Sequence, residues 1–193
     1  MVTHVYIHGL NSSGVNNSTA KLIQSTIPGC TVYSPSYDSS QPFDVNFQHL
    51  VEQIIDNIDI TPDTIIFGSS LGGVYAEQLA QHFNAKCVLF NPVVQNEQLT
   101  QFISEQICFA DNTRYQFTQQ LIDSYDLTKR STIPLLVYAS NNDGVLNDNF
   151  DKVCKKYQGR AQIIEHKGDH RLTKIDPLLA DNIQQMENWL VIY

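Results

Sequence analysis

A serine between glycines lies where a short apolar run changes into a helical pattern. Residues 68–72 read Gly-Ser-Ser-Leu-Gly, which fits G-x-S-x-G with Ser70 as the central serine. In a strained strand-to-helix turn of this kind the serine hydroxyl is exposed, and the flanking glycines relieve crowding around it. We therefore expect Ser70 to be a nucleophile for acyl transfer. The alternative is a tight turn with no chemical role.

Two later segments supply an acid and a base in the chain order Ser, Asp, His that this type of sheet uses. Asp143 follows the apolar run 135–140, and His170 follows the run 161–166. Both lie just beyond the carboxyl ends of expected strands, where ligand sites form in open α/β sheets. We expect His170 to act as the base and Asp143 to orient it, although the Asp-Gly pair also suits a plain turn. His166 is the rival histidine, and we expect it to point into or along the sheet.

Acyl transfer also needs two donors for the developing oxyanion. The backbone N–H of Leu71, directly after the serine, is one candidate, and that of Leu10, in the loop after the first apolar run, is the other. His8 precedes this loop, and we expect it to brace the loop rather than to act as a second catalytic histidine. The polar residues 11–13 either belong to this pocket or cap the following helix.

The elements that must position these residues alternate between short apolar runs and helical periodicities. We expect six strands, at residues 4–8, 31–34, 64–68, 86–90, 135–140 and 161–166. Helical patterns cover residues 43–58, 73–83 and 177–192. Such alternation predicts an α/β fold with three layers, a mostly parallel sheet in the order 2-1-3-4-5-6 and helices on both faces. Strands 1 and 3 are then neighbours whose connections leave on opposite faces, which opens a crevice at the switch point.

Two details complete the predicted fold. The inward stripe of the first helical pattern consists of Phe47, Leu50, Val51, Ile54 and Ile55. Residues 93–130 do not fit one crossover helix, and we expect a helical insertion with two short helices, around Gln98–Ile107 and Thr118–Tyr125. This insertion is either a small cap over the site or an extra helix pair at the sheet edge. Its aromatic side chains either line an apolar acyl pocket or belong to the core.

Composition limits the class of protein and of partner. The chain has 193 residues, which indicates one domain over residues 1–193. Its formal charge of −8 argues against nucleic acid or an anionic membrane as partner. The first residues do not resemble a signal peptide, and no apolar run approaches the length of a membrane span. The four cysteines lack metal-site spacing, so we expect buried, reduced thiols and a cytoplasmic protein, the alternative being one disulfide in an exported protein.

Five segments together resemble a known family: residues 8–13 (His-Gly-Leu-Asn-Ser-Ser), 68–73, 91–92 (Asn-Pro), 143–146 and 168–170. They are similar to the YqiA-type small bacterial esterases of the α/β-hydrolase superfamily. The resemblance implies an α/β-hydrolase fold, hydrolysis of short-chain acyl esters, no metal or organic cofactor, and a triad of Ser70, Asp143 and His170. Three positions depart from the family pattern, namely Gly144 where Glu is usual, Asp169 where Asn is frequent, and Arg171 where a small residue follows. These departures bear on substrate preference more than on reaction type.

The same three side chains also serve other functions. A thioesterase or an acyltransferase uses the same triad, and a binding protein can keep the fold without turnover. A complete triad favours catalysis on a small-molecule ester, with Ser70 as nucleophile and the Leu10 and Leu71 amides as oxyanion donors.

Overall fold

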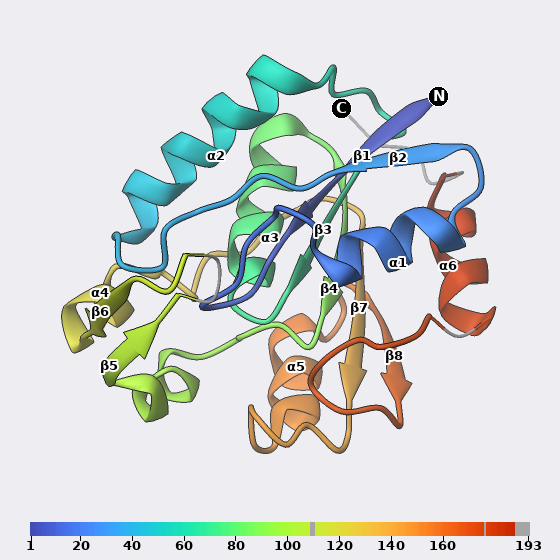
Figure 1. The fold of residues 1–193 in the computed structure, drawn as a ribbon. Helices are drawn as coiled ribbons and strands as arrows, with labels where there is room; N and C mark the ends of the chain where they lie inside the picture. The colour runs from blue at the N-terminus through green and yellow to red at the C-terminus, as the bar shows by residue number, and fades with distance from the viewer. Residues whose placement is uncertain (109–110, 176, 188–193) are drawn as a thin grey trace.

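A computed structural model of the protein describes residues 1–108, 111–175 and 177–187. Its centre is a sheet of six strands in the order β2-β1-β3-β4-β7-β8, with all neighbouring strands parallel (Figure 1). The strands are β1 (Val2–Ile7), β2 (Cys30–Tyr33), β3 (Ile65–Ser69), β4 (Lys86–Phe90), β7 (Leu135–Ser140) and β8 (Gln162–His166). Counted along the chain within this sheet, the order is the predicted 2-1-3-4-5-6, which is confirmed.

Helices cover both faces of the sheet, as predicted (Figure 1). One face carries α2 (Phe43–Asn57), α3 (Gly72–Phe83) and α5 (Asn149–Tyr157), which share one apolar cluster with the sheet. The other face carries α1 (Ser18–Thr26) and α6 (Pro177–Glu187), which share a second cluster. Helix α1 is capped by Asn17, whose side chain accepts from two amides of the first turn, so residues 11–13 are not its cap. The helices that follow β1 and β3 therefore leave on opposite faces, as expected at a switch point.

The strands read as continuous apolar runs because both of their faces are buried. Ile65 and Phe67 of β3 pack in the cluster under α1 and α6, whereas Ile66 packs under α2 and α3. In α2, Leu50, Val51 and Ile54 are buried as predicted, but Ile55 is 62% exposed. The prediction for Ile55 was wrong because each helical residue turns by about 100°, which carries it past the edge of the buried stripe.

The insertion over residues 93–130 is less helical than predicted. It contains the 3-10 turns η1 (Asn96–Gln98) and η2 (Thr100–Phe102), the antiparallel hairpin β5 (Ser104–Ile107) and β6 (Arg114–Phe117), and helix α4 (Gln119–Asp123). The helix expected near 118–125 is thus present as α4, whereas the one expected over 98–107 is wrong. The hairpin forms because residues 104–107 pair with 114–117, a contact that helical periodicity does not reveal.

Several predictions concern single residues or the chain end. Phe117 and Tyr125 of the insertion are buried in the core, and Phe109 lies outside the described residues. The predicted end of the last helix, with Trp189, Leu190 and Ile192, also lies outside them.

Each of the four cysteines is a thiol, but only Cys87 is fully buried, so the expectation of burial is wrong for the other three. Among the helices that the structure describes, none combines the length and the apolar character needed to cross a bilayer.

Candidate active site

Ser70 occupies a left-handed turn between β3 and α3. Its φ is +53°, a conformation that costs a residue with a side chain about 1–2 kcal/mol. The turn is tied to the exit of β4, because the Ser70 amide donates to Phe90 O at 3.0 Å and Ser70 O accepts from Val93 N at 3.1 Å. A strained, externally fixed serine between a strand and a helix is the geometry of a nucleophile turn.

The two glycines of the motif are required by close packing. A Cβ on Gly68 would lie 2.5 Å from Ala76 Cβ, and one on Gly72 would lie 2.2 Å from His8 O. Both separations are too short for any side chain. The motif therefore lets α3 start directly against β3 and lets the turn approach the end of β1.

The loop after β1 passes beside the Ser70 hydroxyl. A Cβ on Gly9 would lie 3.2 Å from Ser70 Cβ and 3.8 Å from Ser70 Oγ. Leu71 directly follows the serine, and Leu10 directly follows Gly9, the residue that approaches the Ser70 side chain. Neither amide donates to a backbone carbonyl in the turns and loops of the described chain.

Asp143 and His170 form a hydrogen-bonded pair. His170 Nδ1 lies 2.8 Å from Asp143 Oδ2, and the two side chains are 12% and 1% exposed. Asp143 Oδ1 also accepts from the amides of Val145 and Leu146, at 2.9 and 2.8 Å. A carboxylate here accepts the Nδ1 proton and leaves His170 Nε2 as the acceptor nitrogen, which is the tautomer that a general base requires.

The pKa of Asp143 reflects opposing influences. Burial raises the pKa of this carboxyl, but hydrogen bonds from His170 and the Leu146 and Val145 amides outweigh burial and bring the pKa below its ordinary value. Asp143 is consequently ionised at neutral pH, as an orienting acid must be.

Asp169 connects the two loops of this pair. Its Oδ1 accepts from the His170 amide at 2.6 Å and from the Gly144 amide at 3.2 Å. These backbone hydrogen bonds lower the pKa of its carboxyl. Two positions that depart from the family pattern, 144 and 169, therefore contact each other.

The other candidate histidines are buried and structural. His8 stacks on Tyr37 with ring centroids 4.3 Å apart, donates from Nδ1 to Gly9 O, and accepts from Tyr37 N at Nε2. Burial lowers its pKa to about 4, against a smaller opposing influence from the Gly9 hydrogen bond, so it is neutral and braces the loop. His166 is buried too and stacks on Tyr138 of the neighbouring strand β7.

The predicted residues therefore gather at one end of the sheet. Ser70, Asp143 and His170 follow β3, β7 and β8, whose parallel strands all end at the same edge (Figure 1). Asp143 and His170 are hydrogen-bonded, whereas Ser70 Oγ and His170 form no hydrogen bond within the described part of the chain. Such bonds are often long without substrate and tighten only in the reacting complex.

Sequence reasoning missed the side chains that hold the loop after β1. Asn11, with a φ of +60°, accepts from Tyr115 Oη and donates to Gln106 Oε1 at 2.9 Å. Both partners belong to the hairpin β5–β6, about 100 residues further along the chain, so no local sequence pattern predicts these two hydrogen bonds. The insertion thereby contacts the loop that carries the predicted oxyanion donor Leu10.

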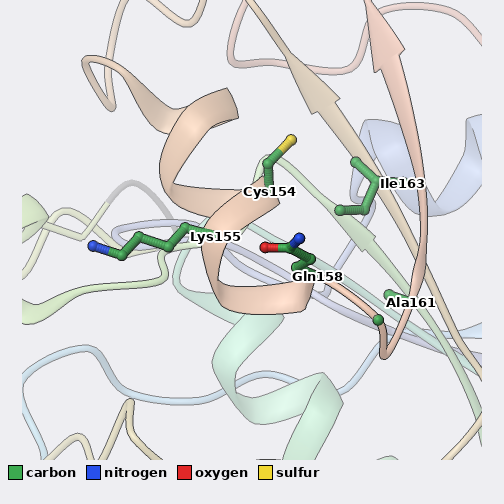
Figure 2. A pocket seen from close by; sticks show the side chains of 6 residues that line it. Cys154, Lys155, Gln158, Ala161 and Ile163 are labelled. Carbon is green, nitrogen blue, oxygen red and sulfur yellow. The ribbon is translucent and has the colours of Figure 1, made fainter.

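Two hollows are lined by residues other than the triad candidates. One, of about 620 Å³, lies between α5 and the edge strand β8 and is lined by Cys154, Gln158 and Ile163 among others. Figure 2 shows Lys155 extending away from Ile163 there. The second, of about 430 Å³, lies against the histidine loop and is bordered by the exposed Arg171. No triad candidate lines either hollow. Across residues 1–108, 111–175 and 177–187, no cluster of three His, Cys, Asp or Glu side chains could hold a metal ion.

Comparison with known proteins identifies the family and the fold. The chain matches the uncharacterised protein family UPF0227 over residues 3–187, which confirms the predicted YqiA-type resemblance. Est1E from Butyrivibrio proteoclasticus, solved with ferulic acid, has a TM-score of 0.71 at 13% identity, covering 96% of this chain and 88% of that one. The structure described for the metagenome-derived lipolytic enzymes LipS and LipT has a TM-score of 0.68 at 16% identity, covering 97% and 93%. An S-formylglutathione hydrolase from Staphylococcus aureus has a TM-score of 0.65 at 17% identity, covering 96% and 84%. At such identities the likeness shows the fold, which is the α/β-hydrolase fold.

Proposed function

We propose that the chain, which belongs to the uncharacterised protein family UPF0227, is a serine hydrolase that cleaves short-chain acyl esters. The observation that carries the proposal is the pair of His170 Nδ1 and Asp143 Oδ2 at 2.8 Å, at the same sheet edge as the strained turn of Ser70. The names of the structural neighbours, which include lipolytic enzymes and an S-formylglutathione hydrolase, agree with this chemistry.

The proposed reaction has two steps. Ser70 Oγ attacks the acyl carbonyl carbon while His170 Nε2 takes the hydroxyl proton, and the tetrahedral intermediate then expels the alcohol, which receives that proton. Water next attacks the acyl-enzyme, His170 again takes a proton, and Ser70 leaves with it as the acid is released. Asp143 stays ionised and stabilises the imidazolium in both steps.

The oxyanion is stabilised by backbone donors. The amides of Leu10 and Leu71 are proposed to bind it, and removing such a donor typically costs about 10²- to 10³-fold in kcat. Helix α3 begins at Gly72, so its positive end also lies beside the developing charge. The close approach of Gly9 to Ser70, where an added Cβ would lie 3.2 Å from Ser70 Cβ, supports a pocket that is formed before substrate arrives.

A fluorophosphonate probe tests the nucleophile. We expect the protein to be labelled and Ser70→Ala to lose both labelling and ester hydrolysis, by roughly 10⁴-fold or more in kcat. Ser69→Ala is the matched control, because Ser69 is adjacent but its Oγ bonds Tyr6 Oη at 2.7 Å. Labelling that persists in Ser70→Ala would show that the nucleophile is another residue.

A non-catalytic binding protein is the second candidate, favoured by the missing hydrogen bond between Ser70 and His170. It predicts no labelling of the wild-type chain and no turnover of p-nitrophenyl esters of any acyl length. Matched ester and thioester substrates then separate an esterase from a thioesterase, and added alcohol acceptors reveal acyl transfer.

A further inference from the structure

Asn91 directly follows β4, whose exit ties down Ser70, and β4 pairs with β7, the strand that precedes Asp143. Asn91 is 1% exposed, and its φ is +43°. Asn is one of the few residues with a side chain that adopts this left-handed conformation readily. Its own amide donates to Tyr138 O of β7 at 3.0 Å, so its backbone is fixed.

The side-chain amide of Asn91 uses its full hydrogen-bonding capacity. Oδ1 accepts from the Ser140 amide at 2.7 Å and faces His166 Nε2 at 3.2 Å. Nδ2 donates to Asp169 O at 3.2 Å and to His170 O at 2.8 Å. Two acceptor positions and two donors are all that a carboxamide offers, so the orientation of the group is determined.

His166 joins this network in one tautomer. Its Nδ1 faces the Gly168 amide at 3.0 Å, and because an amide N–H can only donate, Nδ1 is the acceptor. Nε2 therefore carries the proton and donates to Asn91 Oδ1. Ser140 Oγ in turn donates to Gly168 O. Buried side chains of β7, of β8 and of Asn91 after β4 thus hold successive backbone groups of residues 168–170.

The loop held in this way is otherwise exposed. Lys167, Gly168 and Asp169 are exposed, and the link from Asp169 to Gly144 is a solvent-accessible hydrogen bond. A short exposed loop loses considerable conformational entropy when it is fixed in one conformation. The hydrogen bonds from Asn91 are partly buried, so water weakens them less than it weakens the exposed bond between Asp169 and Gly144, and one of them ends on the carbonyl of His170 itself.

We propose that Asn91 is a positioning residue for His170, holding the backbone of the histidine loop so that the imidazole faces Asp143 and the serine turn. This inference rests on the proposed function for its kinetic consequence. Asn91 also accepts a hydrogen bond from the amide of Ser140, the last residue of β7, just before the Asp143 loop. It therefore fixes the loop of the base relative to the loop of its acid. Asn91 acts through His170 and contacts no substrate.

Two substitutions test this role. Asn91→Gly removes the carboxamide and suits the positive φ, and Asn91→Asp keeps the shape but replaces the two donors with an oxygen that repels both carbonyls. We expect both variants to fold and to lose about 10²-fold in kcat with an unchanged KM, as for a displacement of the base by about 1 Å. The control is Tyr157→Phe, which loses a buried hydrogen bond to Glu77 far from the histidine loop. It should lose stability but keep kcat.

The second measurement does not depend on turnover. The low-field NMR resonance of His170 Nδ1–H, assigned by its absence in His170→Ala, should broaden or vanish in both Asn91 variants and persist in Tyr157→Phe. Folded Asn91 variants with the wild-type resonance would overturn the proposal whatever their kcat, and so would failure of both to fold. If the wild-type protein hydrolyses no ester, the proposed function fails, but the resonance still decides whether Asn91 positions His170.

Discussion

Replacing Gly72 with alanine inserts a methyl group between the nucleophile turn and strand β1. The new Cβ would lie 2.2 Å from His8 O and 2.4 Å from Ile7 O, whereas real Cβ atoms keep at least 3.0 Å from such atoms. The turn and β1 must therefore separate by at least 0.8 Å. Because β1 is paired on both sides, with β2 and β3, we expect the turn that carries Ser70 to move.

This displacement has a calculable consequence for the proposed reaction. The β1 loop carries the Leu10 amide and the turn carries Ser70, so moving them apart opens the oxyanion pocket by nearly 1 Å. A misplacement of that size costs about 10²-fold in rate. Overpacking of a close contact also costs about 1–3 kcal/mol of stability. We expect Gly72→Ala to remain folded with kcat reduced about 10²-fold.

The assay is hydrolysis of p-nitrophenyl acetate, with active sites counted by the fluorophosphonate probe and stability followed by urea unfolding. Gly29→Ala is the control, because Gly29 has a φ of +74° and no atom within 4 Å of a new Cβ, and it lies at the opposite end of the sheet. That variant should lose about 1–2 kcal/mol of stability and no kcat. A folded Gly72→Ala protein with wild-type kcat would refute the reasoning, because the serine would then tolerate the movement.

Three further predictions follow from contacts around the site. Asp143→Asn should reduce kcat by about 10⁴-fold with unchanged circular dichroism, because the amide no longer favours the productive imidazole tautomer; a loss below tenfold would exclude Asp143 as the orienting acid. Tyr115→Phe removes one hydrogen bond to Asn11 and should lower kcat by up to about tenfold, measured with the same ester; an unchanged kcat would show that the hairpin does not support the oxyanion loop. Burial lowers the pKa of both His4 and His8 to about 4. Between pH 6.5 and 4 the two histidines are therefore protonated in the unfolded chain and neutral in the folded chain. The free energy of unfolding should therefore fall as the pH falls from 6.5 to 4, by about 3 kcal/mol for each histidine, and urea unfolding at constant stability across this range would contradict it.

Features set by neighbouring residues could be predicted from the sequence. The strands were identified because runs such as 135–140 are apolar on both faces, a pattern typical of a covered parallel sheet. The turn at Ser70 was identified because its glycines and serines stand between a strand and a helix, and steric limits on φ act within a few residues. Asp143 and His170 were named from their positions after strands, since parallel strands end at a common edge.

Other features arise only when distant segments meet. Strand β5 fell within a segment predicted as a helix and β6 was not predicted, because both strands are short and gain their order from each other rather than from a strong pattern of their own. Asn11 meets Tyr115 across 104 residues, and Asn91 meets His170 across 79. Neither pair leaves a periodic signal in the sequence, so nothing local distinguishes these two asparagines from ordinary turn residues.

The sequence by itself thus determined the six strands of the main sheet, their order and the chemical groups at the strand ends. The tertiary structure alone decided which nitrogen of His170 meets Asp143, which buried amide holds the histidine loop, and which hairpin contacts the β1 loop. The physical reason is the distance along the chain over which each interaction acts. Backbone sterics and hydrophobic periodicity act over a few residues, whereas hydrogen bonds between loops depend on distances that exist only after the sheet has formed.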